Sequence, residues 1–331
     1  MRRGTTHAGR NRTMTRLTIP RRRLIQGAAA AVLMPSLGVL AQAPPRALRI
    51  GNQKGILSLL KGRSTLEKRL QPLNVSLKWT EFTAGPVQLE ALNVGSIDFG
   101  DVGEAPPIFA QAAGAPLAYV AATVPRPAVE AVIVPKGSTI RTVADLKGKK
   151  IALNKGSNVH YFIVKLFEKH GLTYSDLNLV YLPPADARAA FEKGSVDAWV
   201  IWDPFLAAAQ TTLDARLLAD ATGVVGNRAY YFSSLDYVAK NADVLKIVVE
   251  EINRIDQWAE ANQSAYATEL AGLLGLPKVA LDLFVGRTRY GTAPITKAIL
   301  AEQQQIADTF FALKLIPKKI NVLEAAAAGI A

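Results

Sequence analysis

Two short loops of the chain carry residue types that bind small anions. Asn154-Lys-Gly-Ser-Asn158 follows an apolar run at 151–153 and opens a helical pattern. A helix start presents unpaired backbone N–H groups at the positive end of the helix dipole, which is an anion site, and glycine allows close approach. Gly156, Ser157 and Asn158 are therefore candidate ligand-binding residues, although many such loops are only helix starts.

The chain contains a weaker version of the same loop about a hundred residues earlier. Residues 50–55, with Gln53, Lys54 and Gly55, are echoed by residues 151–156. Gly-Ser-Ile-Asp at 95–98 likewise recurs as Gly-Ser-Val-Asp at 194–197. These repeats predict two similar α/β units whose matching loops face each other across a cleft.

Other candidate residues lie where strands end. Asp203-Pro204 is typical of an N-cap followed by a first-turn proline, and we favour that structural role. A carboxylate in an anion pocket contributes to binding only through a partner lysine or a cationic ligand tail, and Glu104 has the same ambiguity. Trp202 ends a buried strand and is either core or cleft wall, because open α/β sheets bind ligands at the carboxyl ends of their strands.

Two further candidates are aromatic or ionisable. Tyr230 and the neighbouring Tyr231 lie near a predicted crossover, where hinge packing or ligand contact would suit them. His160 could donate to an anion, although a lone histidine is usually structural.

Signals for an enzyme are poor. The sequence has no Walker loop, GxGxxG, HExxH or GxSxG motif and no cysteine. His160 and His170 are too isolated to suggest a metal site. We therefore predict a protein without catalytic residues, metal or cofactor.

Short apolar runs alternate with helical patterns from residue 47 onward, which is typical of an α/β fold. A strand that ends at Trp202 is expected at 196–202, after a helix ending near Gly194. A further strand, on which the chain returns to the first unit, is expected at 229–233. After residue 235 long helical patterns dominate, at 241–260, 264–273, 277–284 and 294–312. We expect these helices to pack back on the first unit. The predicted domains are therefore 44–134 and 235–331 for one lobe and 135–234 for the other, with crossings near 134 and 234.

The net charge of +12 suggests nucleic acid at first sight, but its distribution does not. Residues 1–43 hold eight arginines and no acid, and the remainder has 31 basic against 27 acidic residues. This part of the chain has no basic stripe interleaved with aromatic residues. Nucleic-acid binding is therefore not expected.

The basic N-terminus is typical of an export signal. Arginines 21–23 precede a small-residue apolar run at 27–40, and cleavage is expected near Ala41 or Ala43. The arginines resemble those of a twin-arginine signal. The run is shorter than the ~20 residues that a membrane-spanning helix needs. We expect an exported, periplasmic protein.

Several segments resemble the periplasmic aliphatic-sulfonate-binding proteins of ABC transporters. They are QKG at 53–55, FTAGPVQLEALNVGSIDFG at 82–100, GEAPPIFAQAAGAPL at 103–117, TVADLKGKKIALNKGSN at 142–158, LPPADARAAFEKGSVDAWVIWDPF at 182–205 and IPKKINV at 316–322. The resemblance covers essentially everything after the signal. It implies a two-lobed periplasmic-binding-protein fold of type II (a Venus flytrap) that closes on a small anion. The family partners are an ABC permease and its ATPase, and a monomer is expected.

The resemblance also implies a set of site residues. Those carried over are Gln53, Gly103, Glu104, Gly156, Ser157, Asn158, His160, Trp202 and Asp203. Related sequences often have serine in place of Asn158 and aspartate in place of Glu104.

Other ligands and one other class of protein stay open. Taurine would give Glu104 or Asp203 an ammonium partner, whereas nitrate has no tail and would leave Trp202 unexplained. The same fold also hosts enzymes of menaquinone and thiamine-precursor synthesis, against which the export signal weighs.

Overall fold

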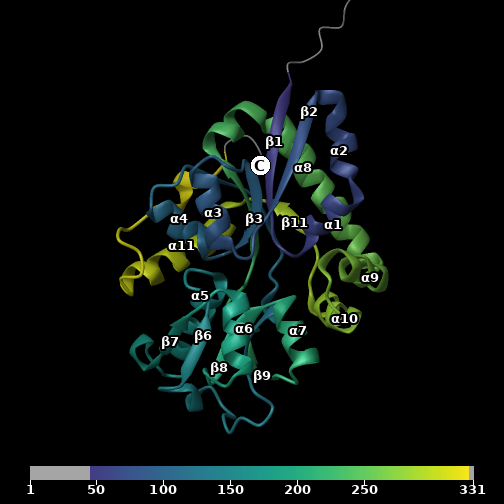
Figure 1. The fold of residues 1–331 in the computed structure, drawn as a ribbon. Helices are drawn as coiled ribbons and strands as arrows, with labels where there is room; N and C mark the ends of the chain where they lie inside the picture. Colours follow the sequence, from purple (N-terminus) through teal and green to yellow (C-terminus); the bar gives the residue numbers. More distant parts are fainter. Residues whose placement is uncertain (1–44, 328–331) are drawn as a thin grey trace, which may run out of the picture. The chain divides into compact units, whose positions relative to one another are not determined.

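The computed structural model describes residues 45–327, which form two sheets and their covering helices (Figure 1). The export signal expected at 1–43 lies outside these residues. The α/β fold predicted from the alternating pattern is confirmed. We call the part built on the six-stranded sheet lobe 1 and the part built on the five-stranded sheet lobe 2.

Lobe 1 is assembled from both ends of the described chain. Its strands, in spatial order, are β11 (Thr292–Pro294), β4 (Leu117–Thr123), β10 (Ala229–Ser234), β3 (Phe99–Gly103), β1 (Arg46–Asn52) and β2 (Val75–Glu81). β1 pairs in parallel with β2 and β3, whereas β10 runs antiparallel between β3 and β4. The return strand expected at 229–233 thus lies in the middle of the lobe 1 sheet.

Lobe 2 is continuous in sequence. Its strands, in spatial order, are β7 (Asn178–Tyr181), β6 (Lys150–Leu153), β8 (Ala198–Trp202), β5 (Glu130–Val134) and β9 (Arg216–Asp220). β6 is parallel to its neighbours, and β5 is antiparallel to both β8 and β9. The carboxyl ends of β6 and β8 therefore lie at one edge of the sheet, where Asn154 and Asp203 follow them.

The helices occupy the positions that the apolar periodicity predicts. In lobe 1 they are α1 (Ile56–Arg63), α2 (Thr65–Leu70), α3 (Gly85–Asn93), α4 (Pro106–Ala112), α8 (Leu235–Ala261), α9 (Gln263–Leu274), α10 (Lys278–Arg287) and α11 (Lys297–Ala312). In lobe 2 they are α5 (Asn158–Lys169), α6 (Pro184–Glu192) and α7 (Phe205–Thr212). The helices α8, α9 and α10 share a buried core with β1 and α1, and α11 shares another with α3 and α4, so all four pack on lobe 1 as expected.

The repeated Gly-Ser-[Ile/Val]-Asp segment makes the same turn in both lobes. Gly95 and Gly194 follow α3 and α6 with φ of 69° and 68°, a left-handed conformation that favours glycine. The aspartate three residues later then accepts a backbone N–H of the neighbouring parallel strand. Asp98 accepts from the Arg49 N–H and Asp197 from the Lys150 N–H, each at 2.8 Å. The repeat is therefore structural, since it ties the end of each helix to the parallel strand beside it.

The chain crosses between the lobes earlier than expected. The crossings lie between β4 and β5 and between β9 and β10, at 124–129 and 221–228, and not near 134 and 234. The strand at 130–134 pairs with β8 and β9 of lobe 2, which its apolar composition alone could not reveal. The short strands β9 and β11 were not predicted.

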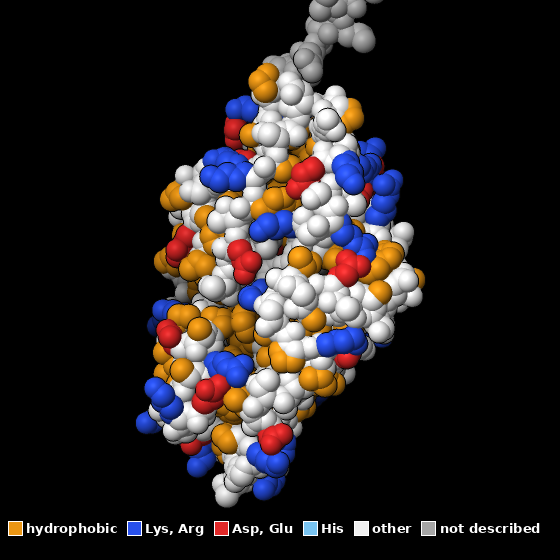
Figure 2. Space-filling model, turned by 45° about the vertical axis from the view of Figure 1, so that its right-hand side comes forward, with side chains coloured by type: hydrophobic (Ala, Val, Ile, Leu, Met, Phe, Trp, Pro, Cys, Tyr) orange, Lys and Arg blue, Asp and Glu red, His pale blue; other side chains and the backbone are white. Residues whose placement is uncertain are grey.

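Charged side chains of both signs are interspersed over the face in Figure 2. Among residues 45–327 no helix has the length and apolarity to span a membrane.

Replacing the aspartate of the repeat in lobe 2 tests this structural role. Asp197→Ala removes the acceptor of the Lys150 N–H and is expected to lower the free energy of unfolding by about 1 kcal/mol. Urea denaturation measures the change. Asp186→Ala, an exposed aspartate on α6, is the control and is expected to cost ~0.5 kcal/mol or less. Equal losses in the two variants would contradict this role.

Candidate functional site

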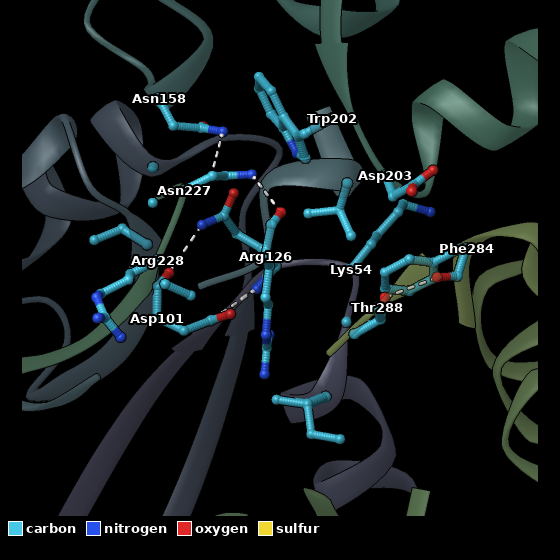
Figure 3. Close-up of a pocket in the computed structure, with 18 of the residues that line it drawn as sticks. Lys54, Asp101, Arg126, Asn158, Trp202, Asp203, Asn227, Arg228, Phe284 and Thr288 are labelled. Carbon is cyan, nitrogen blue, oxygen red and sulfur yellow. Dashed lines mark hydrogen bonds between the residues drawn. The ribbon is translucent and has the colours of Figure 1, made fainter. Parts of the chain in front are cut away.

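One cavity of about 120 Å³ is lined by residues of both lobes and of both crossovers (Figure 3). Six of the ten predicted site residues line it, namely Gln53, Gly103, Ser157, Asn158, Trp202 and Asp203. Lobe 1 adds Lys54 and Asp101, and the crossovers add Arg126 and Asn227. Both loops inferred from the repeat therefore line the same cavity.

The start of α5 presents backbone donors to the cavity. Ser157 is the N-cap, and Asn158 is the first helical residue. The N–H groups of a first helical turn have no acceptor further back in the helix. The Ser157 hydroxyl donates to the Asn154 carbonyl at 2.7 Å, which shapes the loop. Main-chain N–H groups and the helix dipole, more than this hydroxyl, thus make α5 suitable for an anion.

The Asn158 side chain holds the crossovers in place. Its Nδ2 donates to Glu130 at the start of β5 and to the Asn227 Oδ1 at 3.3 Å. Asn227 in turn donates to the Arg126 carbonyl at 3.1 Å. In this conformation the amide hydrogens of Asn158 are committed to protein acceptors, so the side chain positions the hinge.

Gly103 marks a close approach of the two lobes at the cavity. A Cβ at this position would lie 2.9 Å from the Cβ, Cγ and Oδ1 atoms of Asn158. Such contacts are too short for a real side chain, and the opposing atoms belong to a residue fixed by hydrogen bonds. Only glycine lets the end of β3 meet the start of α5.

Asp203 is not the N-cap that we expected, because that position belongs to Pro204, but its side chain still accepts a backbone N–H of the first turn of α7. Its Oδ1 accepts from the Ala207 N–H at 2.9 Å at the start of α7, and the Asp203–Pro204 peptide bond is cis. Its Oδ2 lies 3.2 Å from the Nε of Arg287, at the end of α10 in lobe 1. Burial raises the pKa of Asp203 to about 7, although Arg287 opposes the shift. Arg287 also donates to Gln210 of α7 at 2.7 Å, so this side of the molecule has a polar contact between lobes.

Four of the predicted site residues lie outside the lining of this cavity: Glu104, Gly156, His160 and Tyr230. Gly156 instead lines a depression between α3 and α4. Tyr230 is buried in lobe 1 against Tyr119, and its neighbour Tyr231 lines the cavity. The alternation of side chains along β10 explains this difference, since successive residues point to opposite faces.

His160 and Glu104 lie outside the cavity lining and form hydrogen bonds with residues next to it. His160 is buried, accepts from the Gly156 N–H at 3.3 Å and contacts the Tyr174 hydroxyl at 3.2 Å. Burial lowers the pKa of His160 to about 4, so it is neutral at physiological pH. Glu104 accepts from the Arg228 N–H at 3.2 Å, and burial raises its pKa to about 8. The nearby Glu130 is also buried, and its pKa is raised by burial and by Glu104.

Arg126 is a cavity residue that our sequence analysis did not single out. Figure 3 shows it in the middle of the lining residues. Its side chain is 14% exposed, its Nη2 lies 3.7 Å from the Oδ1 of Asp256, and its buried Nε has no hydrogen-bond partner. The available signal was an arginine flanked by prolines in the segment between two apolar strands, Pro125-Arg126-Pro127.

Arg228 also lines the cavity but is occupied elsewhere. It donates to Glu302 at 2.8 and 3.3 Å and to the Thr123 carbonyl at 2.9 Å. Arg126 therefore offers a spare donor where Arg228 does not. No group of three or more acidic, histidine or cysteine side chains within 45–327 is arranged to hold a metal ion.

Comparison with known proteins identifies the family. The model of the family described as NMT1/THI5 like matches residues 73–265. Over 305 residues the chain is 41% identical to an aliphatic sulfonates-binding protein of Escherichia coli, an alignment covering 91% of this chain and 95% of the relative. The chain belongs to the NMT1/THI5-like family.

Solved structures of family members agree with the fold. One is the alkanesulfonate-binding protein SsuA from Xanthomonas axonopodis pv. citri, bound to MOPS. It is 41% identical, with a TM-score of 0.81 over 86% of this chain and 99% of that one. The periplasmic aliphatic sulphonate binding protein SsuA from Escherichia coli is 40% identical, with a TM-score of 0.78 over 86% and 92% of the two chains. The periplasmic-binding-protein fold that the resemblance implied is thereby confirmed.

A methyl group at residue 103 tests the close approach of the lobes. Gly103→Ala is expected to lower the free energy of unfolding by roughly 1–3 kcal/mol through overpacking against Asn158. Gly55→Ala is the matched control, because its Cβ would meet no atom within 4 Å and its φ of 174° suits any residue. Urea denaturation of both variants makes the comparison, and equal stability of the two would refute the constraint.

Proposed function

We propose that the chain is a periplasmic receptor that captures aliphatic sulfonates for an ABC importer, using the cavity between its lobes. The observation that carries this proposal is the convergence of the α5 start, Arg126 and Trp202 on one cavity. The 41% identity to sulfonate-binding relatives over nearly the whole chain supports it. The chain is a binding protein and not an enzyme.

The chemistry of a sulfonate suits this lining. The group is an anion with three acceptor oxygens at every physiological pH, so it needs several donors and a nearby cation. First-turn N–H groups of α5 and the unpartnered Nε of Arg126 supply them. The Trp202 indole, which is partly exposed, offers an apolar surface to the tail.

The partners and processing follow from the family. We infer that the receptor acts as a monomer, delivers its ligand to a membrane permease driven by a separate ATPase, and loses its signal near Ala41 or Ala43. The two-lobed architecture supports delivery by hinge closure, because a ligand that contacts both lobes favours the conformation in which they meet.

The pH dependence of binding distinguishes an alkanesulfonate from taurine. Burial raises the pKa of Asp101 to about 6 and that of Asp203 to about 7, so both carboxyls lose charge as the pH falls from about 8 to about 6. Neutral neighbours favour a bound anion. Isothermal titration with butanesulfonate is therefore expected to show affinity rising roughly 3- to 10-fold over this window.

Taurine is the matched ligand in that experiment. If its ammonium pairs with one of these carboxylates, its affinity falls over the same window. Tighter binding of taurine than of butanesulfonate, with this opposite pH dependence, would transfer the assignment to taurine. Binding of nitrate or bicarbonate and of neither sulfonate would overturn the proposed substrate class.

Removing the cavity cation tests the role of Arg126. Arg126→Gln is expected to weaken butanesulfonate binding roughly 10- to 100-fold, the effect of losing a hydrogen bond to a charged group. Arg228→Gln is the control, since that guanidinium is held by Glu302, and it is expected to change affinity less than about threefold. Melting temperatures establish that both variants fold, and equal losses of affinity would refute the role of Arg126.

A further inference from the structure

Helix α7 of lobe 2 packs against helix α10 of lobe 1 along one side of the cavity. Figure 3 shows Asp203, which precedes α7, on the same side as Phe284 and Thr288 at the end of α10. All three residues line the cavity. The hydrogen bond from Asn158 to Asn227 joins the lobes at a crossover instead. The α7–α10 interface is thus a further contact between the lobes.

Helix α7 contributes to the cores of both lobes. Ala207 and Ala208 are buried in the same apolar cluster as Phe284 of α10 and the rest of the lobe 1 core. The adjacent Leu206 and Ala209 are buried in the core of lobe 2. Separation of α7 from α10 would expose this alanine surface to water. The apolar part of the interface therefore favours the conformation in which the lobes are in contact.

Arg287, in the last turn of α10, makes polar contacts across this interface. Its Nη2 donates to the Gln210 Oε1 at 2.7 Å, and its Nε lies 3.2 Å from the Asp203 Oδ2. Gln210 follows Asp203 by about two helical turns, so the guanidinium holds α7 at two points along its length. The Nε also donates to the Leu283 carbonyl of its own helix at 3.2 Å, which orients the guanidinium. Arg287 is therefore fixed on lobe 1 and bonded to lobe 2.

Burial makes these contacts costly to lose. The Arg287 side chain is 16% exposed, and that of Asp203 is fully buried. Among residues 45–327 the Asp203 Oδ2 has no hydrogen-bond partner, so Arg287 supplies its neighbouring positive charge. A buried carboxylate that loses its counter-charge is strongly destabilised. Parting the two helices would separate this pair, which adds to the preference for contact.

We propose that Arg287, with Asp203 and Gln210, forms a closure latch that holds lobe 2 against lobe 1 and favours the closed conformation of the receptor. The proposal rests on the function proposed above, because it concerns closure around the ligand. Arg287 lies outside the lining of the cavity, so it acts on the lobes and not on the ligand.

A latch of this kind affects all ligands alike. A receptor whose binding-competent form is only partly populated binds with an affinity lowered by that fraction. The fraction is a property of the protein alone, so losing the latch lowers the affinity for every ligand by one common factor. A residue that contacts the ligand, in contrast, affects ligands of different structure to different degrees.

Distances between spin labels on the two lobes test the latch without any ligand. The chain has no cysteine, so Glu90→Cys on α3 and Asp186→Cys on α6, both exposed, give unique labelling positions. Pulsed dipolar electron paramagnetic resonance then separates closed from open conformations. In Arg287→Met the ratio of closed to open protein is expected to fall roughly tenfold, the effect of losing a hydrogen bond to a charged group. An unchanged distance distribution would overturn the latch.

Isothermal titration with methane-, butane- and hexanesulfonate tests the common factor. The titrations are run at pH 8, above the pKa of about 7 to which burial raises Asp203, so that its carboxylate is ionised. Arg287→Met is expected to weaken binding of all three ligands equally, by up to roughly tenfold. Gln210→Leu removes one acceptor and no charge, and it is expected to weaken all three by about two- to tenfold.

Arg289→Met is the matched control, because it removes the same charge from an exposed arginine close to the end of α10. It is expected to change neither the distances nor the affinities. Losses in Arg287→Met that differ between ligands would overturn the latch, since they indicate contact with the ligand. If no sulfonate binds the wild type, the proposed function fails and the distances alone decide the latch. Melting temperatures establish folding, and Gln210→Leu decides if Arg287→Met does not fold.

Discussion

The hydrogen bonds between the two crossovers are the constraint on which the cavity between the lobes depends. The Arg126 N–H donates to the Gly226 carbonyl at 3.0 Å. The Asn227 side-chain amide donates in turn to the Arg126 carbonyl. Asn158 of lobe 2 then bonds to Asn227. The segment that joins the lobes is thereby also the floor of the cavity, so the position of the Arg126 guanidinium is set by the hinge.

The cavity contains charges of both signs, and burial determines how they act. Asp101, Asp203 and Asp256 share the lining with Arg126, which would cancel its field if all three were fully ionised. Burial raises the pKa of each of these carboxyls, which moves them toward the neutral form. The cavity therefore loses negative charge at a higher pH than exposed aspartates would. Partial neutralisation of these carboxyls lowers the repulsion that an anion in the proposed site would meet.

The local sequence predicted the helices and strands better than it predicted which strands pair with one another. The Gly-Ser-[Ile/Val]-Asp repeat and the loop at 154–158 located two turns and the start of α5, because glycine conformation and helix starts depend on neighbouring residues. Sheet pairing depends on residues far away in the chain. The sequence pattern therefore placed the crossings too late and missed β9 and β11. Arg126 escaped notice for the same reason, since only the fold brings its crossover to the start of α5.

The insertion of β10 between β3 and β4 has a consequence for the order of folding during synthesis. β10 pairs with strands more than a hundred residues earlier, whereas every strand of lobe 2 lies within 130–220. Lobe 2 can therefore complete its sheet while the six-stranded sheet still lacks a central member. Contacts of long sequence separation form slowly because their loops are costly to close. Until residues 229–234 arrive, β3 and β4 each keep an unpaired edge, and such edges are where aggregation begins.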